Sequence, residues 1–73
     1  MKTPRLREWR ESQGETQASL AKLAGVTEHT IWRLEGGADA RPSTARKLAR
    51  ALDVAVVDLM DRPPVRAGEY QRV

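Results

Sequence analysis

The chain has 73 residues, which is enough for one domain with a small hydrophobic core. It has no cysteine and one histidine, so we expect no disulfide, no structural metal and no cofactor. Thirteen basic and ten acidic residues give a formal net charge of +3, and the basic residues gather near the start and around residues 41–50. Such clusters suit either an ordinary solvated surface or a cationic face for a polyanion.

The chain has no apolar run long enough to span a membrane and no signal-peptide pattern at its start. We therefore expect a cytoplasmic protein without a membrane partner. Apolar residues recur at helical spacing and strand patterns are nearly absent, which predicts an all-α fold of five helices. The first helix is predicted over residues 4–13, with Thr3 as its N-cap, Pro4 at its first position and Gly14 after its end.

Two short predicted helices are separated by a three-residue turn. The first of them covers residues 17–24, after the N-cap Thr16, and the second covers residues 28–35, after the N-cap Thr27. Gly25 permits the left-handed backbone that a sharp turn requires. The turn's middle residue is apolar, which indicates that the turn packs against the core. The pattern predicts a helix-turn-helix, whose second helix can lie in the major groove of DNA.

The fourth helix is predicted to begin after Ser43 or Thr44, and a fifth, shorter helix covers residues 56–60. Two consecutive prolines follow, and proline cannot continue a helix. We therefore expect one domain, residues 1–61, followed by a flexible tail, residues 62–73.

A longer pattern runs in register through residues 5–60. Its members are Arg10, Thr16-Gln17, Leu20-Ala21, Gly25-Val26-Thr27, Thr30-Ile31, Leu34-Glu35, Gly37, Arg41-Pro42, Leu48-Ala49, Ala51-Leu52, Val54 and Leu59. With these residues the chain resembles the lambdoid repressor and Cro family, also called the XRE family. The resemblance implies a compact five-helix, lambda-repressor-like domain that binds double-stranded DNA, with residues 28–35 as the recognition helix.

The resemblance assigns base contacts to the outward positions of the recognition helix, Thr27, Glu28, His29 and Arg33. Arg33 is the strongest candidate, because arginine can donate two parallel hydrogen bonds to guanine. Its alternatives are a phosphate contact or plain surface. Glu28 can accept from a cytosine amino group or orient a neighbouring arginine, and His29 can donate to a base or a phosphate or remain solvated.

The resemblance also assigns contacts with the DNA backbone, to Thr16, Gln17, Thr30, Trp32 and Arg41. Gln17 opens a helix, where free backbone N–H groups attract an anion. Trp32 can stack on a sugar, touch a thymine methyl group or donate its indole N–H to a phosphate. Its alternative is packing on the loop near Arg41.

Five further residues have expected structural roles. Arg10 and Glu35 are expected to form a buried ion pair between the first and third helices. Val57 and Met60 of the fifth helix suit either a dimer contact or local packing. The isolated Trp9 is expected to belong to the core.

The sequence departs from the family pattern at several positions. Glu15 occupies a position that is usually apolar, and Val57 occupies one where a polar residue is common. Gly36 replaces a commoner polar residue and loses a possible phosphate contact. Asp53 stands where glycine normally ends the fourth helix, although aspartate tolerates that conformation better than most residues. Ala55 is a poor N-cap for the fifth helix.

The sequence thus predicts a transcriptional regulator, a repressor that binds a near-palindromic operator as a homodimer with helix 28–35 in the major groove. The alternative is a protein-interaction module of the same fold, such as an antitoxin, whose tail 62–73 orders on a protein partner. An enzyme is not expected, because the chain has no pair of nucleophile and base, no metal cluster and no phosphate loop.

Overall fold

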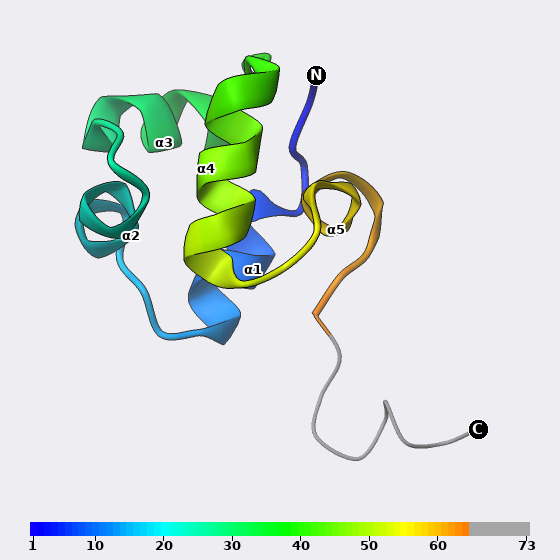
Figure 1. The fold of residues 1–73 in the computed structure, drawn as a ribbon, viewed down its shortest axis with the longest axis horizontal. Helices are drawn as coiled ribbons and strands as arrows, with labels where there is room; N and C mark the ends of the chain where they lie inside the picture. Colours follow the sequence, from blue (N-terminus) through cyan, green and yellow to red (C-terminus); the bar gives the residue numbers. More distant parts are fainter. Residues whose placement is uncertain (65–73) are drawn as a thin grey trace.

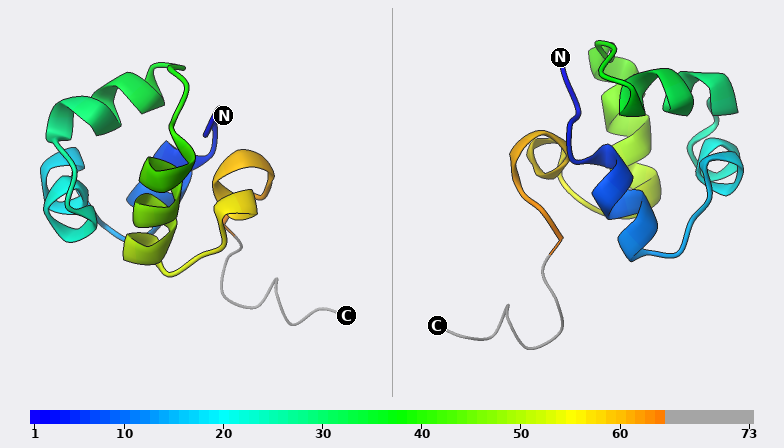
Figure 2. Two further views of the ribbon diagram at one scale, coloured as in Figure 1. Left: turned by 45° about the horizontal axis from the view of Figure 1, so that its top comes forward. Right: turned by 180° about the vertical axis from the view of Figure 1, so that it is seen from behind.

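The structure, a computed structural model, describes residues 1–64, and within them it has five helices and no strand. The helices are α1 (Leu6–Ser12), α2 (Gln17–Ala24), α3 (Glu28–Glu35), α4 (Pro42–Leu52) and α5 (Val56–Asp61). In Figure 1, α4 runs through the middle, with α2 and α3 on one side of it and α5 on the other. Figure 2 shows from behind that α1 covers the other face of α4. The predicted all-α fold of five helices is confirmed.

The predicted tail is only partly within the described residues, since 65–73 lie outside them. None of the five helices is long and apolar enough to cross a lipid bilayer.

The core gathers around α4, whose buried residues Ala45, Leu48, Ala49 and Leu52 follow helical spacing on one face. Each of the other helices presents at least one leucine or isoleucine to this face, and these side chains are buried. They are Leu6 of α1, Leu20 of α2, Ile31 and Leu34 of α3, and Leu59 of α5. Helix α4 therefore holds the α2–α3 pair on one side and α5 on the other.

The ends of α2 and α3 fix the helix-turn-helix. Thr16 Oγ1 accepts a hydrogen bond from the Ser19 N–H at 2.9 Å, and Ser19 Oγ accepts one from the Thr16 N–H at 2.8 Å. Serine thus completes a reciprocal cap for which the sequence offered no glutamate. Thr27 caps α3 by accepting from the Thr30 N–H at 3.1 Å. Gly25 has φ +74°, so the turn uses the left-handed backbone that was predicted.

The predicted start of the first helix is wrong, because α1 begins at Leu6 and its N-cap is Arg5. Thr3 is not a cap: it is buried, and its Oγ1 has no hydrogen-bond partner. The Arg5 N–H donates to the Leu59 carbonyl at 2.8 Å. This hydrogen bond to α5 therefore holds the chain before α1, and a capping rule that considers only neighbouring residues cannot predict it.

The predicted N-cap of the fourth helix is also wrong. Helix α4 begins at Pro42, and Arg41 is its N-cap, without a side-chain hydrogen bond. Proline suits the first helical position, because its φ is already helical and its missing N–H would have no partner there. At the other end Asp53 has φ +57° and ends α4 in the left-handed conformation.

The first residues of the chain are fastened to the loop between α3 and α4. The Met1 amino group donates to the Ala40 carbonyl at 2.9 Å, and the Ala40 N–H donates to the Met1 carbonyl at 2.6 Å. Lys2 Nζ donates to the Gly37 carbonyl at 2.6 Å. This loop is therefore held at two points.

Candidate nucleic-acid interface

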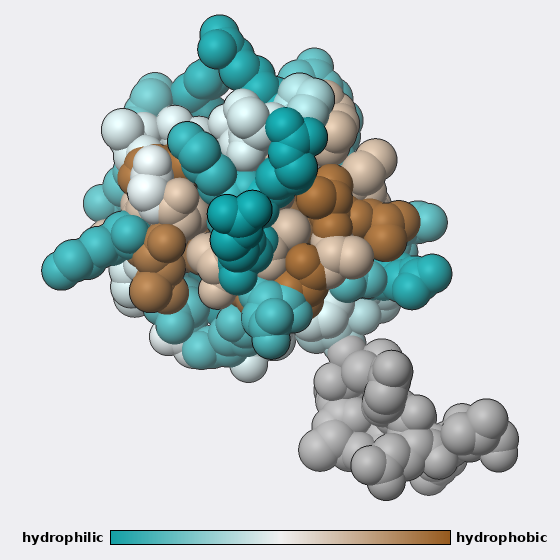
Figure 3. Space-filling model, in the orientation of Figure 1, coloured by the Kyte–Doolittle hydropathy of each residue, from teal (hydrophilic) through white to brown (hydrophobic). Residues whose placement is uncertain are grey.

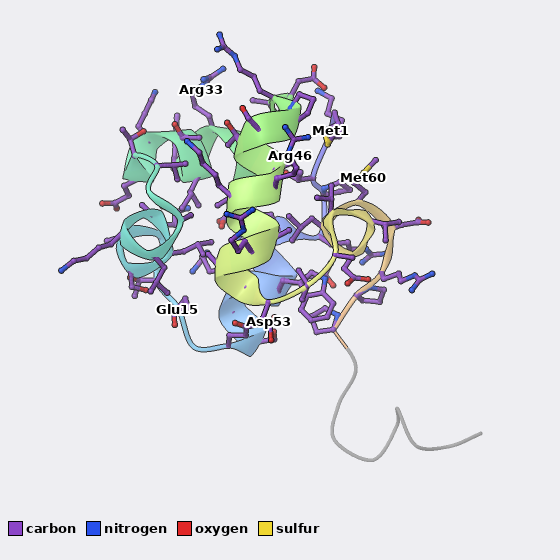
Figure 4. The ribbon with its side chains drawn as sticks, in the orientation of Figure 1. Met1, Glu15, Arg33, Arg46, Asp53 and Met60 are labelled. Atoms are coloured by element: carbon purple, nitrogen blue, oxygen red, sulfur yellow. The ribbon has the colours of Figure 1, made fainter. Side chains whose placement is uncertain are left out.

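One side of α3 is buried and the other is open. Ile31 and Leu34 are buried against the core. The outward side chains are exposed: Glu28, His29, Trp32 and Arg33. Figure 4 shows Arg33 extending away from the body of the protein. No described residue covers the outer side of α3, which is the side predicted to enter a DNA groove.

The two ring side chains on this side lie against each other. The His29 and Trp32 rings are stacked, with centroids 5.5 Å apart and an angle of 22° between their planes. Trp32 is 59% exposed. The stack makes a single flat surface of two residues that the sequence treated separately.

Glu35 joins three helices at the end of α3. Arg10 of α1 donates from Nε to Glu35 Oε2 at 2.6 Å and from Nη2 to Glu35 Oε1 at 3.1 Å. Gln17 of α2 donates from Nε2 to Glu35 Oε1 at 3.0 Å. The Arg10 and Glu35 side chains are only 11% and 7% exposed. The predicted ion pair partners are thus in contact, and Gln17 joins them, which the sequence did not indicate.

The electrostatics of this network favour the charged forms. Burial raises the pKa of Glu35, but the hydrogen bonds from Arg10 and Gln17 and the charges of Arg10 and Arg7 outweigh it. The pKa of the Glu35 carboxyl therefore lies below its ordinary value. The hydrogen bond to Glu35 in turn raises the pKa of Arg10 above its ordinary value, against the effect of burial.

Arg33 lines two hollows, one on each side of α3. The smaller hollow, of about 370 Å³, lies toward the start of α4 and is also lined by Thr30, Asp39, Arg41 and Thr44. The structure thus brings Arg33, Thr30 and Arg41 together. The Thr30 hydroxyl is 2.8 Å from that of Thr27, so these two predicted contact residues also bond each other.

The larger hollow, of about 520 Å³, lies on the other side of α3. It is lined by Gln17, Trp32 and Arg33 from the predicted set, and also by Arg7 of α1. Arg7 is not among the contact residues predicted from the sequence. Its membership of the N-terminal basic cluster was the one available signal, and spacing along the chain does not reveal that α1 reaches α3.

The remaining predicted contacts lie on α5. Val57 and Met60 are 44% and 40% exposed, and Figure 3 shows hydrophobic surface over this helix. Trp9 packs against the core and donates its indole N–H to the carbonyls of Asp58 at 2.9 Å and Arg62 at 2.7 Å. Helix α5 contacts α1 and α4, so this surface is separate from the outer side of α3. Residues 1–64 contain no group of three potential metal ligands among His, Cys, Asp and Glu.

Comparisons with known proteins agree with the helix-turn-helix fold. Residues 4–62 match the family model described as helix-turn-helix domain. Among solved structures, the chain is similar to the restriction-modification controller protein C.AhdI from Aeromonas hydrophila, with a TM-score of 0.72 and 34% sequence identity. The match covers 78% of this chain and 88% of C.AhdI. A search of curated proteins found no match.

Proposed function

Since this chain belongs to the helix-turn-helix family and is an XRE/Cro-like DNA-binding regulator, we propose that it is a repressor acting as a homodimer on a near-palindromic operator. Helix α3 enters the major groove of each half-site, and the bound dimer blocks a promoter. Each module of this size buries only about 600–1,000 Å² on DNA, so two half-sites about 34 Å apart raise the affinity.

The observation that supports this proposal is the open side of α3, with its opposite side anchored by Ile31 and Leu34. The exposed Arg33 is the candidate for a guanine, and Glu28 and His29 precede it on the same side. Gln17 and Arg41 line the hollows on opposite sides of α3. In the proposed complex they contact the two DNA backbones that border the groove.

The direct test is selection of bound sequences from random duplexes, followed by measurement of the mass of the complex. Wild type is expected to select a motif with two-fold symmetry. Arg33→Ala should lose the preference at one base position in each half-site and keep its non-specific affinity, whereas Arg50→Ala, an exposed cation on α4, should keep the motif. Equal loss on all sequences would assign Arg33 to a phosphate instead.

Contacts with the backbone are tested by the salt dependence of affinity. Arg41→Ala should weaken binding to every sequence alike and lower the slope of log K against log salt concentration by about 0.9. Gln17→Ala should also weaken all sequences alike. A slope for Arg41→Ala equal to that of wild type would contradict its contact.

The dimer is tested at α5. A charge at Val57 or Met60 should shift the protein toward the monomer in sedimentation experiments, because it would be buried in the interface. Leu23→Asp is the matched control, since Leu23 is 61% exposed and lies on α2. Val57→Asp and Met60→Glu proteins with unchanged mass and unchanged operator affinity would contradict α5 as the interface.

A further inference from the structure

The first three residues of the chain form a strap along the loop that joins α3 to α4. This loop covers residues 36–41 and ends at Arg41, the proposed contact with a DNA backbone. Asp39, Ala40 and Arg41 line the smaller hollow beside α3, so the loop is part of the candidate interface. In Figure 1 the N-terminus lies beside the upper end of α4, where the loop arrives.

One backbone and one side-chain hydrogen bond join the strap to the loop. The Ala40 N–H donates to the Met1 carbonyl at 2.6 Å, and Lys2 Nζ donates to the Gly37 carbonyl at 2.6 Å. Lys2 Nζ also lies 3.6 Å from Asp39 Oδ2, but these side chains are 61% and 69% exposed. Water weakens an exposed ion pair of this kind, so the hydrogen bond to Gly37 is the principal connection made by Lys2.

The strap is itself anchored in the body of the protein. Thr3 is 2% exposed, and its carbonyl accepts from the Leu6 N–H of α1 at 3.0 Å. Two residues later the Arg5 N–H donates to the Leu59 carbonyl of α5. Because the end of the strap is fixed on two helices, the strap can restrain the loop.

The second half of the loop depends on this restraint. The N–H groups of Gly37 and Ala38 donate to carbonyls of α3, whereas the Ala40 N–H donates to the strap. Gly37 has φ +105°, and within the loop only Ala40 is buried. A glycine-containing loop with so little burial has many conformations open to it. Ordering it when DNA binds would lower the affinity.

We propose that Lys2 is a positioning residue for DNA binding, which holds the loop in place before DNA arrives and thereby presents Arg41 to the backbone. Lys2 does not contact DNA in this arrangement, because its ammonium group is engaged by the loop. The inference rests on the proposed DNA binding. It adds a residue outside the helix-turn-helix whose effect passes through Arg41.

The first test compares three lysine variants on the selected operator. Lys2→Met should lower the affinity about three- to tenfold, the loss expected for one hydrogen bond. It should keep the base preference and the slope of log K against log salt concentration, because no phosphate contact is removed. Lys2→Arg keeps a donor for the Gly37 carbonyl and should restore the affinity. Lys47→Met makes the same change on the exposed side of α4 and should bind as wild type does.

The second test asks whether the effect passes through Arg41. In an Arg41→Ala background the loop no longer carries its contact, so Lys2→Met should have little further effect on affinity. A slope lowered by about 0.9 in Lys2→Met, or its full loss of affinity in the Arg41→Ala background, would show that Lys2 binds a phosphate directly. Either result would overturn the inference.

The third test needs no DNA. In the free protein, amide hydrogen exchange at Ala40 should be faster in Lys2→Met than in wild type, while exchange at Leu48 in the middle of α4 stays the same. Equal exchange at Ala40 would show that Lys2 does not hold the loop. If wild type selects an operator and Lys2→Met binds it equally well, the inference alone is overturned. Absence of DNA binding by wild type at low salt would overturn the proposed function as well.

Discussion

Replacing Arg10 with methionine removes the cation from a nearly buried ion pair and leaves Glu35 without its main partner. Three hydrogen bonds are lost, two to Glu35 and one from Arg10 Nη1 to the Glu15 carbonyl at 2.8 Å. Stranding one member of such a pair costs about 3–5 kcal/mol, because the remaining charge stays desolvated. At about 0.05–0.15 kcal/mol per residue, 73 residues correspond to a total stability of roughly 4–11 kcal/mol. We therefore expect the loss to take up a large part of the free energy of unfolding.

The measurement is urea unfolding followed by circular dichroism at pH 7 and low temperature, so that the variant is still folded without denaturant. Arg10→Lys keeps the charge but not the two-point hydrogen bond, and its loss should be intermediate. The double variant Arg10→Met with Glu35→Leu removes both charges, and it should recover most of the stability. A loss below about 1 kcal/mol for Arg10→Met would show that the pair behaves like an exposed one, and the argument from burial would be wrong.

Three further results are expected. Because the pKa of Glu35 is lower in the folded protein, its ionised carboxyl contributes stability that is fully present above the unfolded-state pKa of about 4.3. Urea unfolding should show this contribution decreasing as the pH falls through the folded-state pKa, and Glu35→Gln should not show that decrease. Asp53 has φ +57°, a backbone conformation that glycine adopts with less strain, so Asp53→Gly should raise the free energy of unfolding by up to about 1 kcal/mol and with it the melting temperature. A lower melting temperature would show that the Asp53 side chain has its own stabilising role. Thr27→Ala removes the cap that accepts from the Thr30 N–H and should cost about 1 kcal/mol, measured by the same unfolding experiment, with Ser in place of Thr27 as the control that retains it.

The parts of the fold that the sequence predicts are those decided by neighbouring residues. The N-caps Thr16 and Thr27 and the left-handed Gly25 lie within a few residues of the groups they serve. The two caps predicted wrongly are those where other constraints decide. Arg5 donates its N–H to Leu59 of α5, and the ring of Pro42 sets the start of α4 before Ser43 or Thr44 can act.

The same distinction applies to the candidate site. The outward residues of α3 follow from helical periodicity, since Ile31 and Leu34 define the buried side. The hydrogen bond from Gln17 to Glu35 joins residues of different helices, and so does the hollow that Arg7 and Trp32 both line. Periodicity within one helix contains no information on how far two helices are apart, so these relations required the packed structure.

The arrangement divides the residues of α3 between two tasks. At eight residues α3 is about 12 Å long, and a helix that short is marginal in isolation. Its orientation therefore depends on the Thr27 cap, the buried Ile31 and the connection of Glu35 to α1 and α2. Within residues 1–64, Glu28 and Arg33 form no hydrogen bond or ion pair through their side chains and make no part of the core. Because the supporting groups fix the helix before DNA arrives, little ordering is needed on binding, and the outward side chains can differ in base preference without altering the frame that presents them.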